Sequence, residues 1–129
     1  MKNVLLVDDD NIFNFLNSTM LQRTGMAGEI HTALNGQQAL DMLNGYLSGN
    51  AALPDVILLD LNMPVMDGFG FLEAFKKILL PRKETVSIVI VTSSSNEKDI
   101  DRARTMGITR YLIKPVDEDQ LKDALSSES

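Results

Sequence analysis

Five polar residues that can take part in metal or phosphate chemistry stand at the ends of short apolar segments. They are Asp8, Asp9, Asp60, Thr92 and Lys114. Three carboxylates that converge in a partly desolvated place repel one another, so they need a cation or must take up protons. If the apolar segments are neighbouring strands, the sequence predicts a site for a hard divalent cation at the strand ends.

Magnesium is the ion that this set of residues favours. It prefers oxygen ligands, keeps several waters and often shares its site with a phosphate group. The chain has no cysteine and one histidine, so no cluster favours zinc. A carboxylate such as Asp60 can attack phosphorus to form an aspartyl-phosphate. Lys114 can then neutralise one phosphoryl oxygen, and the Thr92 hydroxyl can donate a hydrogen bond to another.

Five short apolar segments predict strands, and residues with helical spacing separate them. The predicted strands are 3–7, 29–34, 56–59, 86–91 and 111–113. The first helix is predicted over about 11–24, capped by Asp10, with a repeat of Ile12, Phe15, Leu16, Thr19 and Met20. The apolar positions of the next two helices are Ala39, Met42, Leu43, Tyr46 and Leu47, then Phe71, Ala74, Phe75, Ile78 and Leu79.

Cap signals mark the last two helices. Ser94 and Glu97 fit a capping box, and Gly107 is expected to end the helix that it opens. Asp117 and Gln120 open the final helix, whose expected apolar contacts are Leu121, Ala124 and Leu125. Five strands alternating with five helices predict an α/β fold: a doubly wound parallel sheet with the flavodoxin-like order 2-1-3-4-5. Ligands of such sheets bind beyond the carboxyl ends of the strands, where the polar residues stand.

Length and composition limit the other possibilities. The 129 residues predict one domain, 1–129, with 44% hydrophobic and 23% charged residues. The net charge of −6 argues against nucleic-acid binding by this chain alone. The apolar stretch after the N-terminus is too short for a signal peptide or a membrane span. We therefore expect a cytoplasmic protein without membrane insertion.

Four motifs at successive strand ends resemble the receiver domains of two-component response regulators. They are Val-Leu-Leu-Val-Asp-Asp-Asp at 4–10, Leu-Leu-Asp-Leu-Asn-Met-Pro-Val-Met-Asp-Gly at 58–68, Val-Thr-Ser at 91–93 and Tyr-Leu-Ile-Lys-Pro at 111–115. Each motif alone is weak. Their order and spacing together extend the resemblance, which is to the CheY-like type, over essentially the whole chain.

The resemblance implies a role for each site residue. Asp60 is the phosphorylated residue, and magnesium is held by Asp8, Asp9, Asp60 and the backbone carbonyl of Asn62. Thr92 and Lys114 contact the phosphoryl group, while Thr92 and Tyr111 form the conformational switch. The Lys114–Pro115 peptide bond is expected to be cis.

The resemblance also implies partners. A sensor histidine kinase or phosphotransfer protein supplies the phosphoryl group, and an unknown downstream protein binds the altered surface of the fourth helix, fifth strand and fifth helix. The chain is expected to be a stand-alone regulator; a receiver cut from a longer regulator with an output domain has the same sequence over this range. A magnesium-dependent phosphohydrolase and a flavin-binding electron carrier are the alternatives from other classes.

Simpler interpretations exist for several of these residues. The acids 8–10 can belong to a solvated loop that caps a helix, and Thr92 and Tyr111 are types that are common in strands. His31, the only histidine, is expected to be structural. The relation of Thr92, Tyr111 and Lys114 to the acids is what favours the functional interpretation.

Overall fold

The computed structural model describes residues 1–45 and 53–126. Five parallel strands form one sheet with the order β2-β1-β3-β4-β5, which confirms the predicted topology. The strands are β1 (Lys2–Val7), β2 (Ala27–Ala33), β3 (Val56–Leu59), β4 (Ser87–Thr92) and β5 (Tyr111–Ile113). Each strand ends within one residue of its predicted carboxyl end. These are the ends at which the polar residues were expected.

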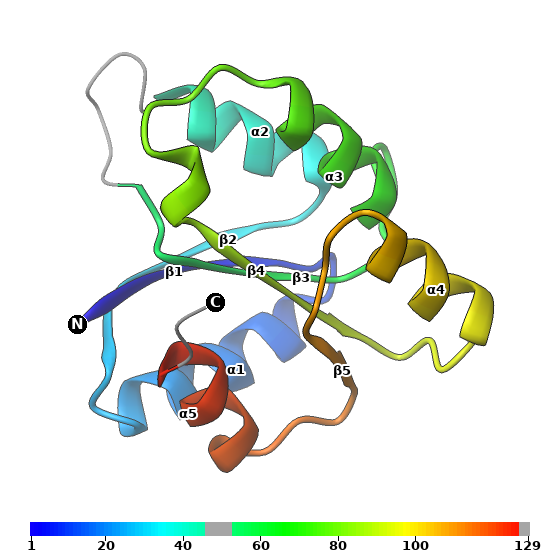
Figure 1. Ribbon diagram of the computed structural model, residues 1–129. Helices are drawn as coiled ribbons and strands as arrows, with labels where there is room; N and C mark the ends of the chain where they lie inside the picture. Colours follow the sequence, from blue (N-terminus) through cyan, green and yellow to red (C-terminus); the bar gives the residue numbers. More distant parts are fainter. Residues whose placement is uncertain (46–52, 127–129) are drawn as a thin grey trace.

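Helices cover both faces of the sheet (Figure 1). They are α1 (Asn11–Arg23), α2 (Gly36–Gly45), α3 (Gly68–Lys77), α4 (Glu97–Thr105) and α5 (Glu118–Ser126), with a short 3-10 helix η1 (Lys83–Thr85) before β4. α1 and α5 lie on one face, and α2, α3 and α4 lie on the other. No helix in the described residues is long and apolar enough to cross a membrane.

The central strand β1 supplies side chains to both faces of the sheet. Val4 and Leu6 belong to the core under α1 and α5, whereas Leu5 and Val7 belong to the core under α2 and α3. Successive residues of a strand point to opposite faces, so a strand that is covered on both sides must be apolar throughout. The continuous apolar run before Asp8 is therefore explained by its central position.

The apolar repeat of α1 does not form its buried face. Ile12, Phe15 and Leu16 are 72%, 69% and 53% exposed. The residues that face the sheet are instead Asn14, Asn17 and Leu21. The helix begins where the Asp10 carboxylate accepts hydrogen bonds from the backbone N–H groups of residues 12 and 13, which confirms the predicted cap. The predicted start of the helix is therefore correct, whereas the face that packs against the sheet carries two asparagines in place of the apolar repeat.

The predicted apolar face of the third helix is also partly wrong. The third helix ends at Lys77, so Ile78 lies outside it and Leu79 is 88% exposed. The Lys83 ammonium donates hydrogen bonds to the carbonyl groups of Phe75, Lys76 and Ile78, which satisfies this helix end.

Helix α4 is capped differently from the prediction. Asn96, not Ser94, is its N-cap, and its carboxamide accepts from the backbone N–H of Lys98. Gly107 follows the end of the helix at a φ of +89°, where glycine is favoured.

Other expectations for the helices are confirmed. Asp117 and Gln120 exchange hydrogen bonds at the start of α5, and the helix buries Leu121, Ala124 and Leu125. In α2, Ala39 and Leu43 are buried. The expectations for Tyr46 and Leu47 lie outside the described residues.

Candidate functional site

The pairing of β1 with β3 places Asp8 and Asp60 side by side. Val7 is in register with Leu59, and each acid is the next residue of its strand. The Asp60 N–H donates to the Val7 carbonyl at 2.9 Å, and the Asp8 N–H donates to the Ala33 carbonyl at 3.0 Å. The ladder of backbone hydrogen bonds thus continues into the site, so that the backbones of both acids are held by the sheet.

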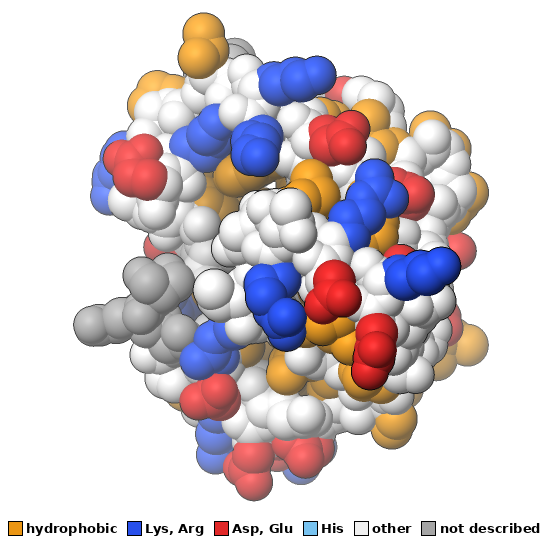
Figure 2. All heavy atoms as spheres, turned by 45° about the vertical axis from the view of Figure 1, so that its right-hand side comes forward, with side chains coloured by type: hydrophobic (Ala, Val, Ile, Leu, Met, Phe, Trp, Pro, Cys, Tyr) orange, Lys and Arg blue, Asp and Glu red, His pale blue; other side chains and the backbone are white. Residues whose placement is uncertain are grey.

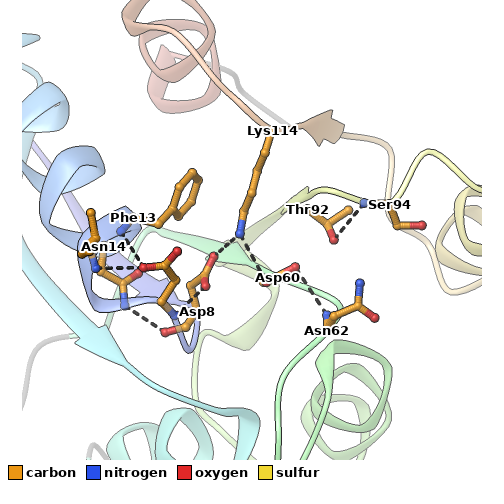
Figure 3. Close-up of polar contacts among 10 residues, drawn as sticks. Asp8, Phe13, Asn14, Asp60, Asn62, Thr92, Ser94 and Lys114 are labelled. Carbon is orange, nitrogen blue, oxygen red and sulfur yellow. Dashed lines mark hydrogen bonds and ion pairs between the residues drawn. The ribbon is translucent and has the colours of Figure 1, made fainter.

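Lys114 reaches both carboxylates from the other side of the sheet end (Figure 3). Its backbone N–H donates to the Thr92 carbonyl at 2.8 Å, directly after β5. Its Nζ lies 2.6 Å from Asp8 Oδ2 and 3.3 Å from Asp60 Oδ2. The ring of Phe13 stands 4.0 Å from the same Nζ, a distance at which an aromatic face attracts a cation. One ammonium group therefore bridges the two buried acids.

The pKa values of Asp8 and Lys114 are shifted by burial and by the contact between the two groups. Burial raises the pKa of Asp8, and the nearby Asp60 charge adds to the rise, while the hydrogen bond from Lys114 opposes it. For Lys114, burial lowers the pKa, but the hydrogen bond to Asp8 and the two carboxylate charges outweigh that effect and raise it. The lysine is held charged, yet its hydrogen bond does not outweigh the effect of burial on Asp8.

The three acids are arranged so that they can hold a metal ion. Oxygen atoms from Asp8, Asp9 and Asp60 all lie within 4.8 Å of one another. Magnesium–oxygen bonds of about 2.1 Å put ligands on opposite sides of the ion about 4.2 Å apart, so a small inward movement of the oxygens gives the required spacing. Asp8 and Asp60 are buried and Asp9 is exposed, which leaves one open side for water or phosphate. The residues fit a hard divalent cation.

The loop between β3 and α3 passes close to Asp60. The Asn62 N–H donates to Asp60 Oδ1 over 3.4 Å, and Asn62 itself is exposed. At the end of the loop, the Gly68 N–H donates to the Leu61 carbonyl. A side chain at position 68 would put its Cβ 2.5 Å from the Asp60 carbonyl oxygen, so only glycine allows this approach. The Gly68 position is thus explained by the geometry of the site.

Thr92 and Tyr111 are linked through Ser94. The Thr92 side chain is fully buried, and its Oγ1 accepts a 3.4 Å hydrogen bond from the Ser94 N–H. The Tyr111 hydroxyl donates to the Ser94 carbonyl at 2.9 Å. Ser94 Oγ donates to Asp99 Oδ2 at 2.6 Å, which ties this loop to the first turn of α4. One residue therefore contacts both predicted switch residues and the adjacent helix.

The structure brings together most of the residues that the sequence singled out. The Lys114–Pro115 peptide bond beside them is cis. His31 lies apart from them on the exposed side of β2, near Glu29. Sequence reasoning assigned no site role to Phe13, Asn14 or Asp99. Asn14 donates a hydrogen bond through Nδ2 to the Asp8 carbonyl. The sequence signal that could have identified this residue is its position, one helical turn after the Asp10 cap.

Comparisons with known proteins agree with this geometry. Residues 4–126 match the model of the response regulator receiver domain family. The chain is 34% identical to the probable methanogenesis regulatory protein FilR2 of Methanothrix harundinacea over 92% of this chain and 76% of that protein. It is 30% identical to sporulation initiation phosphotransferase F of Bacillus subtilis, over 95% of this chain and 89% of the relative.

Solved structures give the same result. A two component response regulator from Cytophaga hutchinsonii superimposes with a TM-score of 0.84 at 32% identity, over 95% of this chain and 92% of that one. The chemotaxis protein CheY4 of Vibrio cholerae has a TM-score of 0.78 at 31% identity, over 97% and 96% of the two chains.

Proposed function

Because this chain belongs to the family of response regulator receiver domains, we propose that it is a signalling switch in which Asp60 accepts a phosphoryl group with magnesium bound beside it. The observation that carries the proposal is the convergence of Asp8, Asp9, Asp60 and Lys114 at the carboxyl ends of β1, β3 and β5. That the chain acts as a single stand-alone domain stays a prediction.

In this proposal Asp60 acts as the nucleophile. One of its carboxylate oxygens forms a bond to phosphorus while the bond from phosphorus to the donor breaks; for a phosphohistidine the imidazole leaves and takes up a proton. Lys114 Nζ, 3.3 Å from Asp60 Oδ2, is close enough to pair with a phosphoryl oxygen once the group is attached. The Thr92 hydroxyl, at the end of the neighbouring strand, is the natural donor to another phosphoryl oxygen.

Magnesium would be held by Asp9 and Asp60, by the Asn62 backbone carbonyl, and by Asp8 largely through water. When bound, the ion offsets the negative charge of the transferring group. The raised pKa of Asp8 supports this assignment, because a buried carboxylate with too few positive neighbours gains most from an added cation.

The response to phosphorylation would begin at Thr92. A move of its hydroxyl towards the phosphoryl group would release the Ser94 N–H and shift the loop that holds both Tyr111 and Asp99. The surface of α4, β5 and α5 would change with this loop and bind the downstream protein. Figure 2 shows that Lys and Arg alternate with Asp and Glu on the side of the molecule that carries α4. A surface of mixed charge fits a protein partner, which carries charges of both signs, better than it fits a partner with charge of one sign.

The phosphodonor would dock on the exposed apolar residues of α1. Ile12, Phe15 and Leu16 form one patch on the helix that Asp10 begins, and Phe13 of the same helix touches Lys114 in the site. An apolar patch next to a phosphate-accepting carboxylate fits a helical donor protein, such as the histidine-bearing domain of a sensor kinase or a phosphotransfer protein.

The test is the intact mass of the protein after incubation with acetyl phosphate and magnesium. We expect the mass of one phosphoryl group to be added to the wild type and to the Asp41→Asn control, which changes an exposed acid on α2. Asp60→Asn should stay unlabelled, and chelation of magnesium should prevent labelling of the wild type. Equal labelling of Asp60→Asn and the wild type would refute the role of Asp60.

A second measurement separates the switch from a phosphohydrolase. Asn62 stands two residues after Asp60, where hydrolases with an aspartate nucleophile usually carry a second acid. We therefore expect no sustained turnover of a generic phosphomonoester such as p-nitrophenyl phosphate. Sustained turnover that Asp60→Asn abolishes would favour the hydrolase.

A further inference from the structure

Two asparagines of α1 are buried under the carboxylate site without a complete set of hydrogen bonds. Asn14 is 4% exposed and Asn17 is 2% exposed. The Oδ1 atom of each has no partner within the described part of the chain. A buried amide oxygen that has lost its water and gained nothing costs free energy, and such atoms are rare in folded proteins. The pair therefore points to a donor that the described residues do not supply.

A small cavity lies beside both asparagines. Its volume is about 10 Å³, and its lining includes Asn14, Asn17, Asp8 and Asp60. This volume is at the lower limit of what one water molecule occupies and is too small for a second one. An apolar cavity of this size stays empty, but the polar atoms beside this one change that expectation.

The chemistry of the two oxygens selects the ligand. Each is an acceptor, and one water molecule has two protons to donate. Asn14 cannot turn its amide round, because its Nδ2 donates to the Asp8 carbonyl at 2.9 Å and an oxygen in that place would face another oxygen. Asn17 needs a partner in either orientation, and water can both donate and accept. No other neutral ligand is as small.

We propose that Asn14 and Asn17 bind one permanent water molecule in this cavity, and that the water fixes the Asn14 side chain in the orientation that holds the Asp8 carbonyl. Asn14 is a positioning residue in this arrangement, since it touches the backbone of a site acid and not the reacting atoms. The hydration site is present in the unphosphorylated, magnesium-free protein. Its test is therefore independent of the function proposed above.

Magnetic relaxation dispersion of water ¹⁷O and ²H counts water molecules that stay inside a protein for longer than it tumbles. The measurement is made on the wild type and on two variants. Asn17→Leu keeps the branching of the side chain but removes the acceptor. Asn11→Leu is the control, because it makes the same change at an exposed position of the same helix. We expect Asn17→Leu to lose one long-lived water and Asn11→Leu to lose none. Equal counts in all three proteins would overturn the proposal.

A crystal structure of the wild type at a resolution that shows ordered water gives a second answer that does not depend on a folded variant. Density within hydrogen-bond distance of both Oδ1 atoms supports the proposal, and an empty cavity refutes it. The crystals are grown with tetramethylammonium in place of sodium and potassium. Density that appears only when one of the two metal ions is added would identify a monovalent cation and would also overturn the proposal.

Discussion

The Lys114 ammonium and the Asp8 carboxylate form the shortest ion pair of the described residues, at 2.6 Å. Their side chains are only 18% and 5% exposed, so solvent screens the pair poorly. Removal of the lysine is strongly destabilising because the buried carboxylates of Asp8 and Asp60 then lose the ammonium that compensates both of them. We expect Lys114→Met to lower the free energy of unfolding at neutral pH by about 2–4 kcal/mol.

Urea denaturation of the magnesium-free protein measures this loss, and Lys122→Met on the exposed side of α5 is the control. The deficit should shrink as the pH falls, because a proton on Asp8 removes the uncompensated charge. A deficit of the same size at neutral and acidic pH would mean that lost packing of the lysine stem, and not charge, causes the effect.

Asp8→Asn should raise the stability of the magnesium-free protein. The pKa of Asp8 is raised above its ordinary 3.8 by burial, so the stability that this group contributes is fully present below 3.8 and is lost as the pH rises through the higher folded value. At neutral pH the ionised Asp8 therefore opposes folding. The amide keeps an oxygen acceptor for Lys114 without the charge, and thermal unfolding of the two proteins without magnesium compares them.

The same variant should respond less to magnesium. For the wild type, magnesium at 100 times its dissociation constant is expected to add about 2.7 kcal/mol to the free energy of unfolding. Asp8→Asn loses one carboxylate and should gain less at the same concentration. An equal gain in both proteins would exclude Asp8 from the metal site.

Magnesium affinity should depend on pH. Protons and the ion compete for Asp8, and its raised pKa brings that competition above the ordinary 3.8. We expect the magnesium affinity of the wild type, measured by calorimetry, to fall as the pH is lowered from neutral towards the raised pKa of Asp8. Asp8→Asn should show a weaker dependence over the same interval.

The fold and most of the site were predictable because they depend on local patterns. A continuous apolar run that ends in an acid identifies a central parallel strand and its functional end, and this happens at both Asp8 and Asp60. Since parallel strands bring their carboxyl ends to one edge, the meeting of acids 52 residues apart follows from the topology alone.

The register of α1 was not predictable from apolar spacing. That method assigns apolar residues to the core, and here Phe15 and Leu16 face solvent while Asn14 and Asn17 face the sheet. The reason lies in a tertiary contact that apolar spacing does not reveal, the hydrogen bond from Asn14 Nδ2 to the Asp8 carbonyl. The same holds for the cap of α4, where Ser94 bonds to Asp99 instead of opening the helix.

The Ser94–Asp99 hydrogen bond should stabilise the loop between β4 and α4. Asp99→Ala removes a partly buried, charge-assisted bond of 2.6 Å and is expected to cost about 1–2 kcal/mol. Amide hydrogen exchange over residues 93–99 should become faster, whereas Asp99→Asn, which keeps an acceptor, should restore most of the protection. Unchanged exchange in Asp99→Ala would show that Tyr111 and the Asn96 cap hold the loop without Asp99.

The exposed patch on α1 should affect only phosphorylation by a protein donor. Phe15→Ser removes the apolar contact of a 69% exposed residue, so the fold is expected to be unaffected. With a phosphorylated histidine kinase that labels the wild type, the rate at low protein concentration should fall roughly tenfold, the equivalent of about 1.4 kcal/mol of binding. Labelling by acetyl phosphate should not change, because that small donor needs only the carboxylate site. The control is Leu79→Ser, which removes an even more exposed apolar side chain, 88% exposed, far from α1 in the sequence. If both variants slow the kinase equally, or if Phe15→Ser also slows acetyl phosphate, α1 is not the docking surface for the donor.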